Sequence, residues 1–213
     1  MKKLLIIGGG GHGAMIASCL KSNQAKGFNT DVELVGYVND YETFIGGLPV
    51  IAKTSDIPRL AGEGYLLSWS IHLICKNKAT YEAYQRMVIP EDSLYTIVHH
   101  SAEIEEDVVL EPGCSVMAHT YIGPRSHIGK GTMVKPHASI GHDVVCGPLC
   151  HFARGSITGS HVNIGICSDV ALGATVIEKR NIGNFAMAGA RSLITKSIPD
   201  GEIHIGSPAR YMR

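Results

Sequence analysis

The sequence lacks an excess of charge of either sign, because 19 Lys and Arg residues balance 19 Asp and Glu residues among 213. Such a chain creates no overall field that attracts nucleic acid or an anionic membrane surface. It also lacks an apolar run of 18 residues, and its first apolar run, residues 4–7, gives way to glycines. That run is too short for a signal peptide or a membrane span. We therefore expect a cytoplasmic protein that neither binds nucleic acid nor inserts into a membrane.

Cysteine pairs of the CxxC type are also absent, although the chain contains six cysteines. In a reducing compartment, scattered cysteines of this kind behave as small buried apolar side chains. We expect no metal site from them.

The first 96 residues alternate between apolar runs and helix-like stretches. Strands are predicted over residues 4–7, 32–38, 65–71 and 94–98, and helices over 14–22 and 77–88. Strands that alternate with helices indicate a parallel α/β unit. We predict a small Rossmann-like domain over residues 1–96.

From Val98 onward the sequence repeats every six residues up to Ile194. Of the seventeen residues at this spacing, sixteen are apolar and thirteen are Val, Ile or Leu, where chance placement gives about eight. A second column, four residues further on, holds small or short side chains from Val108 to Ser192, with Arg180 as the exception. Glycine directly follows the aliphatic residue in several repeats. These glycines are 123, 129, 141, 147, 165 and 183.

A period of six is neither helical nor a simple alternating strand. It is typical of short strands joined by tight corners, in which three repeats complete one triangular coil of 18 residues. Successive coils then stack at the strand-pairing distance of roughly 4.8 Å. We predict an all-β solenoid domain with a C-terminal cap over residues 97–213.

This pattern resembles the left-handed parallel β-helix of the hexapeptide-repeat acyltransferases. The preceding α/β domain makes the whole chain similar to sugar acetyltransferases of the sialic-acid O-acetyltransferase and bacillosamine N-acetyltransferase type. The resemblance implies a homotrimer with active sites between subunits, acetyl-CoA as co-substrate and no metal. It also implies transfer of acetyl to the amine or hydroxyl of a sugar, with a nucleotide-linked sugar as the favoured acceptor, in surface-glycan biosynthesis.

Stacked coils bring residues 18 apart into one column, so Asp143 is expected between Arg125 and His161. Two neighbouring cations keep a carboxylate ionised. The adjacent His142 gains a partner that fixes its tautomer, as a general base requires. In the resembling family, a His followed by an acidic residue at this point is the general base and its partner. The resemblance thus implies catalytic roles for His142 and Asp143.

The resemblance also gives cofactor positions. A second histidine nine residues on, here His151, lies beside the acetyl group in the family. In register with it, further acetyl-CoA contacts fall on Ser160, Leu172 and Ala190. Ser160 and Ala190 depart from the glycines that relatives often have there.

The N-terminal segment Gly8–Gly13 follows a strand and precedes a helix, and it satisfies the pattern G-x-G-x-x-G. Glycines at such a turn let a phosphate approach a helix N-terminus. By resemblance, Gly11, His12 and Gly13 bind the nucleotide sugar together with Asn39 and Asp40 at the end of the second strand. A dinucleotide site and a purely structural turn remain alternatives.

The third strand departs from the family pattern. Many relatives have a Gly-Asn or Gly-Asp turn where this chain has Ser68-Trp69-Ser70-Ile71-His72. Trp69, the only tryptophan, is either a stacking platform for a base or sugar or a packing residue.

Two other functions compete with acetyl transfer. A zinc enzyme of the γ-carbonic-anhydrase type uses the same β-helix and two histidines five residues apart, as His137 and His142 are. The third ligand is expected two coils before His137, where this chain has Ser101. A non-catalytic scaffold that binds sugar nucleotides is the other alternative, and the presence of His142 and Asp143 argues against it.

Overall fold

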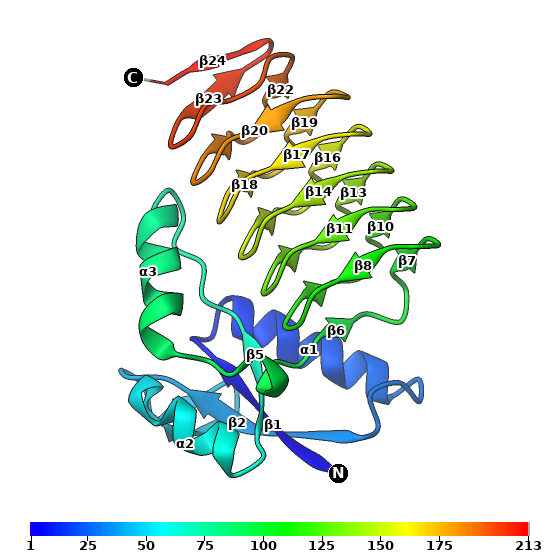
Figure 1. Cartoon of the computed structure of the whole chain (residues 1–213). Coiled ribbons are helices and arrows are strands. Elements are labelled where there is room, and N and C mark those ends of the chain that lie inside the picture. The colour runs from blue at the N-terminus through cyan, green and yellow to red at the C-terminus, as the bar shows by residue number, and fades with distance from the viewer. Residues whose placement is uncertain (213) are drawn as a thin grey trace.

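The computed structural model describes residues 1–212. Its N-terminal part is a five-stranded sheet in the order β3-β4-β2-β1-β5, parallel except for the β3–β4 hairpin (Figure 1). The strands are β1 Lys2–Ile7, β2 Val32–Val38, β3 Phe44–Ile45, β4 Leu48–Ala52 and β5 Leu66–Trp69. The helices are α1 His12–Gln24, α2 Ile57–Gly62 and α3 Asn77–Met87, with short 3-10 turns over Thr54–Asp56 and Glu91–Ser93.

Strand β1 forms the centre of this sheet because it is apolar on both faces. Residues Leu4 to Ile7 are all fully buried, as is usual for a parallel strand covered on both sides. Helix α1 packs close to the sheet at Gly13, where a Cβ would lie 2.9 Å from Tyr37. The sheet thus positions the glycine-rich turn between β1 and α1.

The C-terminal part is a triangular solenoid whose three walls are parallel sheets. Wall A contains β6 Ile97–Val98, β9 Ser115–Val116, β12 Met133–Val134, β15 His151–Phe152, β18 Asp169–Val170, β21 Met187–Ala188, β23 Ile203–Gly206 and β24 Ala209–Tyr211. Wall B contains β7 Glu103–Ile104, β10 Tyr121–Ile122, β13 Ser139–Ile140, β16 Ile157–Thr158, β19 Thr175–Val176 and β22 Leu193–Ile194. Wall C contains β8 Val109–Leu110, β11 His127–Ile128, β14 Val145–Cys146, β17 Asn163–Ile164 and β20 Asn181–Ile182.

The second residue of each two-residue strand points into the prism. From Val116 to Ile194 these side chains are buried and form one apolar core. The corners between walls require a left-handed backbone conformation, and non-glycine residues such as Asp143 (φ 54°) and His161 (φ 57°) adopt it. Side chains at the corners therefore project outward, away from the core.

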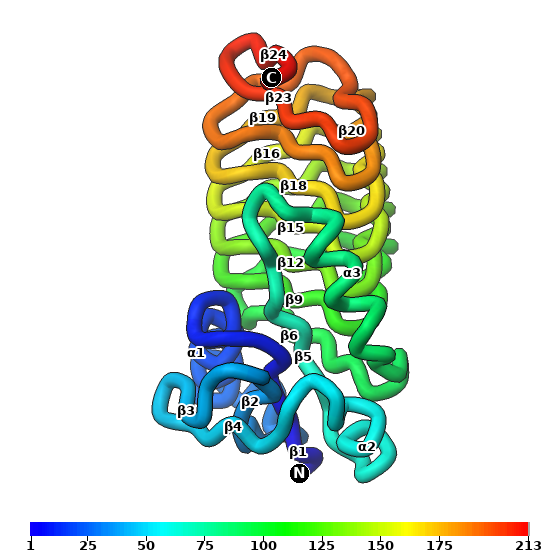
Figure 2. The backbone as a smooth tube through the Cα atoms, turned by 90° about the vertical axis from the view of Figure 1, so that its left-hand side faces the viewer, coloured from blue at the N-terminus to red at the C-terminus, as the bar shows by residue number. Residues whose placement is uncertain are grey.

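The N-terminal part covers only wall A. Helix α3 and the segment before it lie along β9, β12, β15 and β18 (Figure 2). Asn77 at the start of α3 donates a hydrogen bond to the carbonyl of Cys167 on this side of the prism. Walls B and C and the corner between them remain uncovered by the chain's own N-terminal part.

The predicted fold class, an α/β unit followed by a hexapeptide β-helix, is confirmed. The prediction of one strand over residues 94–98 was wrong in extent, because only Ile97–Val98 is a strand and it belongs to wall A. Trp69 is a packing residue, since it is 1% exposed and meets Tyr84 edge-on. The sequence analysis did not find the β3–β4 hairpin or α2. Within residues 1–212 no helix combines the length and the hydropathy that a bilayer crossing demands.

Candidate active site

His142 and Asp143 form a corner between walls B and C, in the turn that joins β13 to β14. His142 Nδ1 lies 2.5 Å from Asp143 Oδ2. This contact fixes the proton on Nδ1 and leaves Nε2 as the basic atom of the neutral ring. The imidazole is 46% exposed, so a substrate can reach it. The corner has the geometry of a general base with a carboxylate partner.

Asp143 is further held by its column neighbours, as the 18-residue spacing predicts. Arg125 donates two hydrogen bonds to the carboxylate, from Nε at 2.9 Å and from a terminal nitrogen at 2.7 Å. His161 Nε2 lies 4.0 Å from Asp143 Oδ2 on the other side. The Arg125 guanidinium, with His142, holds the pKa of Asp143 well below its usual range. The carboxylate therefore stays ionised while its neighbour exchanges a proton.

The structure does not bring His151 to this corner within one chain. His151 opens β15 on wall A, the wall opposite the corner that carries His142. The chain interior lies between them, so the expected set of His142, Asp143 and His151 is not assembled inside a single subunit. The two halves of the predicted site can meet only between chains.

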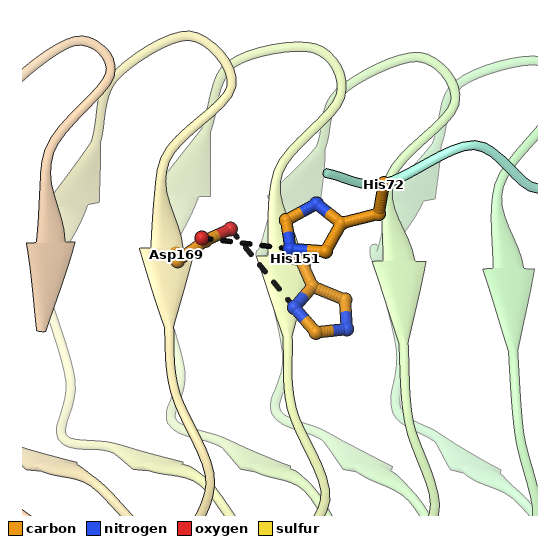
Figure 3. Close-up of side chains that lie close together, drawn as sticks. All are labelled: His72, His151 and Asp169. Atoms are coloured by element: carbon orange, nitrogen blue, oxygen red, sulfur yellow. Dashed lines mark ion pairs between the residues drawn. The ribbon is translucent and has the colours of Figure 1, made fainter. Parts of the chain in front are cut away.

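His151 instead lies in a buried cluster beneath the N-terminal part. Its ring stacks on His72 at a centroid distance of 4.1 Å, and on His12 at 5.5 Å. Asp169 lies beside both (Figure 3). The predicted substrate residue His12 and the predicted cofactor residue His151 are thus neighbours, although they come from different parts of the fold.

Burial dominates the electrostatics of this cluster. It lowers the pKa of His12 and of His72 to about 4, with smaller effects of neighbouring cationic groups. It also lowers the pKa of His151, and it lowers that of the nearby Lys135 to about 8. Burial raises the pKa of Asp169 to about 7. The imidazoles are therefore neutral at pH 7.

Asn39 and Asp40 lie at the carboxyl end of β2 and line a cavity of about 530 Å³. Gly8, Thr54 and Arg86 also line it. Asp40 accepts hydrogen bonds from the backbone and the hydroxyl of Thr54, and Asn39 accepts from the backbone of Tyr41 and Glu42. The cavity lies where open parallel sheets bind ligands, outside the carboxyl ends of their strands.

The other predicted contacts lie at the start of α1 or at corners of the prism. Gly11 is the exposed N-cap residue of α1, and Gly13 is buried against the sheet. Ser160 occupies the same corner column as His142, one coil further on. Leu172, which is 58% exposed, and Ala190 follow strands of wall A at a different corner. These positions can line a single ligand only in a groove shared by two subunits.

The two histidines of the carbonic-anhydrase hypothesis lie at two different corners of the prism. His137 lies at the corner between walls A and B, where it stacks on His119 at 5.2 Å. Ser101, two coils before His137, hydrogen-bonds to His99. No third histidine replaces it at that column position.

Three members of the buried cluster, His72, Asp169 and Lys135, were not predicted as site residues from the sequence. Asp169 follows His151 by one coil, and the two are paired in register between β15 and β18. The 18-residue spacing of the coils could therefore have predicted that Asp169 lies beside His151. Lys135 gave none, because its burial depends on how the N-terminal part covers wall A.

Two family models match parts of the chain. Residues 3–68 match the PglD N-terminal domain, and residues 101–136 match the bacterial transferase hexapeptide (six repeats). A search of curated proteins finds no match in sequence.

Several solved structures share the whole architecture. Perosamine N-acetyltransferase (PerB) from Caulobacter crescentus, solved with CoA and GDP-perosamine, has 27% identity and a TM-score of 0.84 over 100% of this chain and 98% of its own. The acetyltransferase domain of PglB from Neisseria gonorrhoeae, solved with acetyl coenzyme A, has 24% identity and a TM-score of 0.84, with 99% of each chain covered. WeeI from Acinetobacter baumannii has 18% identity and a TM-score of 0.80 over 100% of both chains. The last two matches establish the fold alone.

Proposed function

We propose that this chain, which is similar to sugar acetyltransferases with a PglD N-terminal domain, transfers acetyl from acetyl-CoA to an amino group of a nucleotide-linked sugar. The proposal includes the two-domain division at residues 96 and 97. The His142–Asp143 dyad carries the proposal, because a carboxylate-backed, accessible imidazole is what direct acyl transfer requires. The likeness to the Caulobacter enzyme, which was solved with a nucleotide-linked sugar, supports the substrate class.

In the proposed mechanism, His142 Nε2 takes a proton from the acceptor amine as its nitrogen attacks the thioester carbonyl carbon. A C–N bond forms and the thioester C–S bond breaks. The CoA thiolate leaves, and His142 passes the proton that it took from the amine to the sulfur of CoA. Asp143 keeps the ring in the productive tautomer and stabilises its transient positive charge. A hydrogen-bond donor near the carbonyl oxygen stabilises the tetrahedral oxyanion. His151 or a backbone N–H has this role in the proposal.

The acceptor is held by the N-terminal part. The nucleotide occupies the cavity lined by Asn39 and Asp40, and its phosphates lie at the Gly11–Gly13 turn, where the N-terminus of α1 favours negative charge. Ser160, Leu172 and Ala190 contact acetyl-CoA along the solenoid. Each of these assignments rests on the family resemblance and the position of the residue.

The active form is a homotrimer in this proposal. The reason is that the dyad and the His151 side of the site lie on opposite sides of one prism. Exposed apolar side chains flank the dyad corner on both walls, which supports a partner surface there. They are Tyr121 and Ile157 on wall B and Val109 and Val145 on wall C.

The proposal also includes a cytoplasmic location and a role in surface-glycan biosynthesis. All six cysteines are free, and Cys75 is exposed, which fits a reducing compartment.

The decisive experiment measures CoA release with acetyl-CoA and a panel of acceptors. The panel contains amino sugars linked to GDP, UDP, dTDP and CMP, the matching hydroxy sugars and free sialic acid. We expect turnover with a nucleotide-linked amino sugar. Turnover only with free sialic acid would assign the enzyme to hydroxyl acetylation instead.

The variant His142→Ala tests the dyad. Loss of the general base lowers kcat roughly 10²- to 10⁴-fold while acetyl-CoA binding is retained. His100→Ala is the control, because His100 contacts the hydroxyl of Ser22 at 3.3 Å and lies at the first coil, away from the dyad corner. Unchanged turnover in His142→Ala would favour the non-catalytic scaffold.

A further inference from the structure

Three ligating side chains converge beneath the N-terminal part, on the outer face of wall A. His151 and Asp169 occupy the same position on neighbouring strands β15 and β18, and His72 reaches them from the segment between β5 and α3. The side chains of His72 and Asp169 are 3% and 2% exposed, and that of His151 is 11% exposed. Figure 3 shows a nitrogen of each ring directed towards the carboxylate.

The contacts in this cluster are too long for hydrogen bonds. His72 Nε2 lies 3.5 Å from Asp169 Oδ2, and His151 Nδ1 lies 3.9 Å from Oδ1. Both carboxylate oxygens are buried without a hydrogen-bond partner of good geometry among the described residues, although the Asn77 side chain is near enough to lower the pKa of the carboxyl. Buried polar atoms are almost always satisfied, and exceptions point to an ion or a water that bridges them.

The separations are close to those of ligands around one metal ion for His72 and Asp169, at 3.5 Å, and somewhat longer for His151 and Asp169, at 3.9 Å. Neighbouring ligands of a tetrahedral zinc ion lie about 3.4 Å apart, given bonds of roughly 2.0–2.2 Å. One ligand atom from each of the three residues lies within 4.8 Å of the other two. Two neutral imidazoles and a carboxylate are a ligand set that zinc prefers, with a water as fourth ligand.

The charges around the cluster also call for a cation. Within residues 1–212, Asp169 forms no ion pair with a lysine or an arginine; its only titratable partners at ion-pair distance are the two neutral imidazoles. Lys135 lies nearby, but its ammonium nitrogen points at the sulfur of Met133, 3.7 Å away. His12 stacks beside the two rings at 5.5 and 5.8 Å and is not part of the ligand set.

A second group with suitable spacing, His142, Asp143 and His161, differs in this respect. There the carboxylate already receives two hydrogen bonds from Arg125, and the histidines are exposed. An arginine at that position satisfies the charge that a metal would neutralise.

We propose that His72, His151 and Asp169 bind one zinc ion that fastens the N-terminal part to the β-helix. The ion links a residue of the N-terminal part to two coils of the prism and so holds wall A and its cover together. This site shares no residue with the carbonic-anhydrase hypothesis, which used His137 and His142. It contradicts the expectation that the chain binds no metal. It does not depend on the acetyltransferase proposal, because the ion would use Nδ1 of His151 and leave Nε2 for a contact with the acetyl group.

The test uses the full chain, stripped with a chelator, dialysed and titrated with zinc chloride. Bound zinc is measured by inductively coupled plasma mass spectrometry, and the melting temperature is measured by thermal unfolding. We expect one zinc per chain and a higher melting temperature with zinc, because a ligand that binds only the folded state stabilises it. Cobalt in place of zinc should give the visible absorption bands of a four-coordinate ion.

Two variants locate the site. Asp169→Asn keeps the shape of the side chain but removes the charge, and His72→Gln changes only the N-terminal part. Each should weaken zinc binding at least tenfold. The variant His137→Gln, at the corner between walls A and B, should bind zinc like the native chain. If the native chain retains less than a tenth of an equivalent of zinc, or if both variants bind it normally, the proposal is wrong. Zinc binding without acetyl transfer would uphold this site and reject the proposed function.

Discussion

Asp143 is the residue on which the electrostatics of the candidate site depend. Arg125 and His142 stabilise its ionised form, so its pKa is lowered in the folded chain. A carboxyl group whose pKa is lowered by folding stabilises the folded state above the pKa of the unfolded chain, about 3.9. That contribution shrinks as the pH falls below this value, because the unfolded carboxyl then takes up a proton, and it is lost completely only below the lowered pKa of the folded carboxyl.

The substitution Asp143→Asn should therefore lower the unfolding free energy at pH 7 and lower it by clearly less near pH 2. Urea unfolding at several pH values measures this dependence, with Asp200→Asn at the C-terminal end of the solenoid for comparison. The same variant should lower kcat, since Asn cannot stabilise a positively charged His142. Equal destabilisation at both pH values would show that the side chain acts by packing and not by charge.

Residue pairs inside the solenoid could be predicted from sequence, but pairs across the two parts could not. The 18-residue spacing predicted Asp143 between Arg125 and His161, and the structure has these contacts. The same rule contained the pair of His151 and Asp169. No periodicity connects His72 to them, because that contact depends on how the segment after β5 crosses wall A.

At the scale of elements, the coils stack so closely that several corners admit no side chain. At Gly129, a Cβ would lie 2.4 Å from the carbonyl carbon of Gly147 and 2.5 Å from its oxygen. Backbone on the next coil cannot move away without breaking the strand pairing of β11 with β14. This explains why glycine follows the core aliphatic residue in so many repeats.

We expect Gly129→Ala to destabilise the chain by about 1–3 kcal/mol, as overpacking usually does. Gly62→Ala is the control, because a Cβ there meets nothing within 4 Å and alanine favours the helix. That control should be neutral or stabilising by roughly 0.4–1 kcal/mol. Denaturant unfolding of both variants gives the comparison, and similar stabilities would mean that the coils can separate locally.

The N-terminal elements were predicted less completely than the solenoid. Strands β1, β2 and β5 and helices α1 and α3 were found because they are apolar runs or amphipathic stretches. The hairpin of β3 and β4 and the short α2 were not, since two to six residues carry too little periodicity to be recognised.

For the whole molecule, the main consequence is that the proposed site would be divided, since its residues lie on opposite sides of one subunit. The dyad projects from the corner of walls B and C, and His151 lies on wall A beside the N-terminal part. In a three-fold ring, each dyad would face the N-terminal side of the next subunit. Activity should then depend on assembly.

Subunit complementation tests this dependence. His142→Ala and His151→Ala should each be nearly inactive alone, but equal co-expression should restore activity in about one third of the sites of mixed trimers, one site in each. A site is intact only where a chain with native His142 meets a chain with native His151. Two differently tagged chains, purified in sequence, confirm that mixing has occurred. No recovery in verified mixtures would mean that each subunit works by itself.

The six-residue frame runs from Val98 to Ile194 without an inserted residue. Duplication of one complete coil, such as residues 171–188, would therefore lengthen the prism and leave every later side chain on its original wall. Duplication of a single hexapeptide would instead turn all later side chains onto the neighbouring wall. Evolution can thus change the length of this protein in steps of one coil without moving its reactive groups around the axis, whereas smaller steps would scatter them.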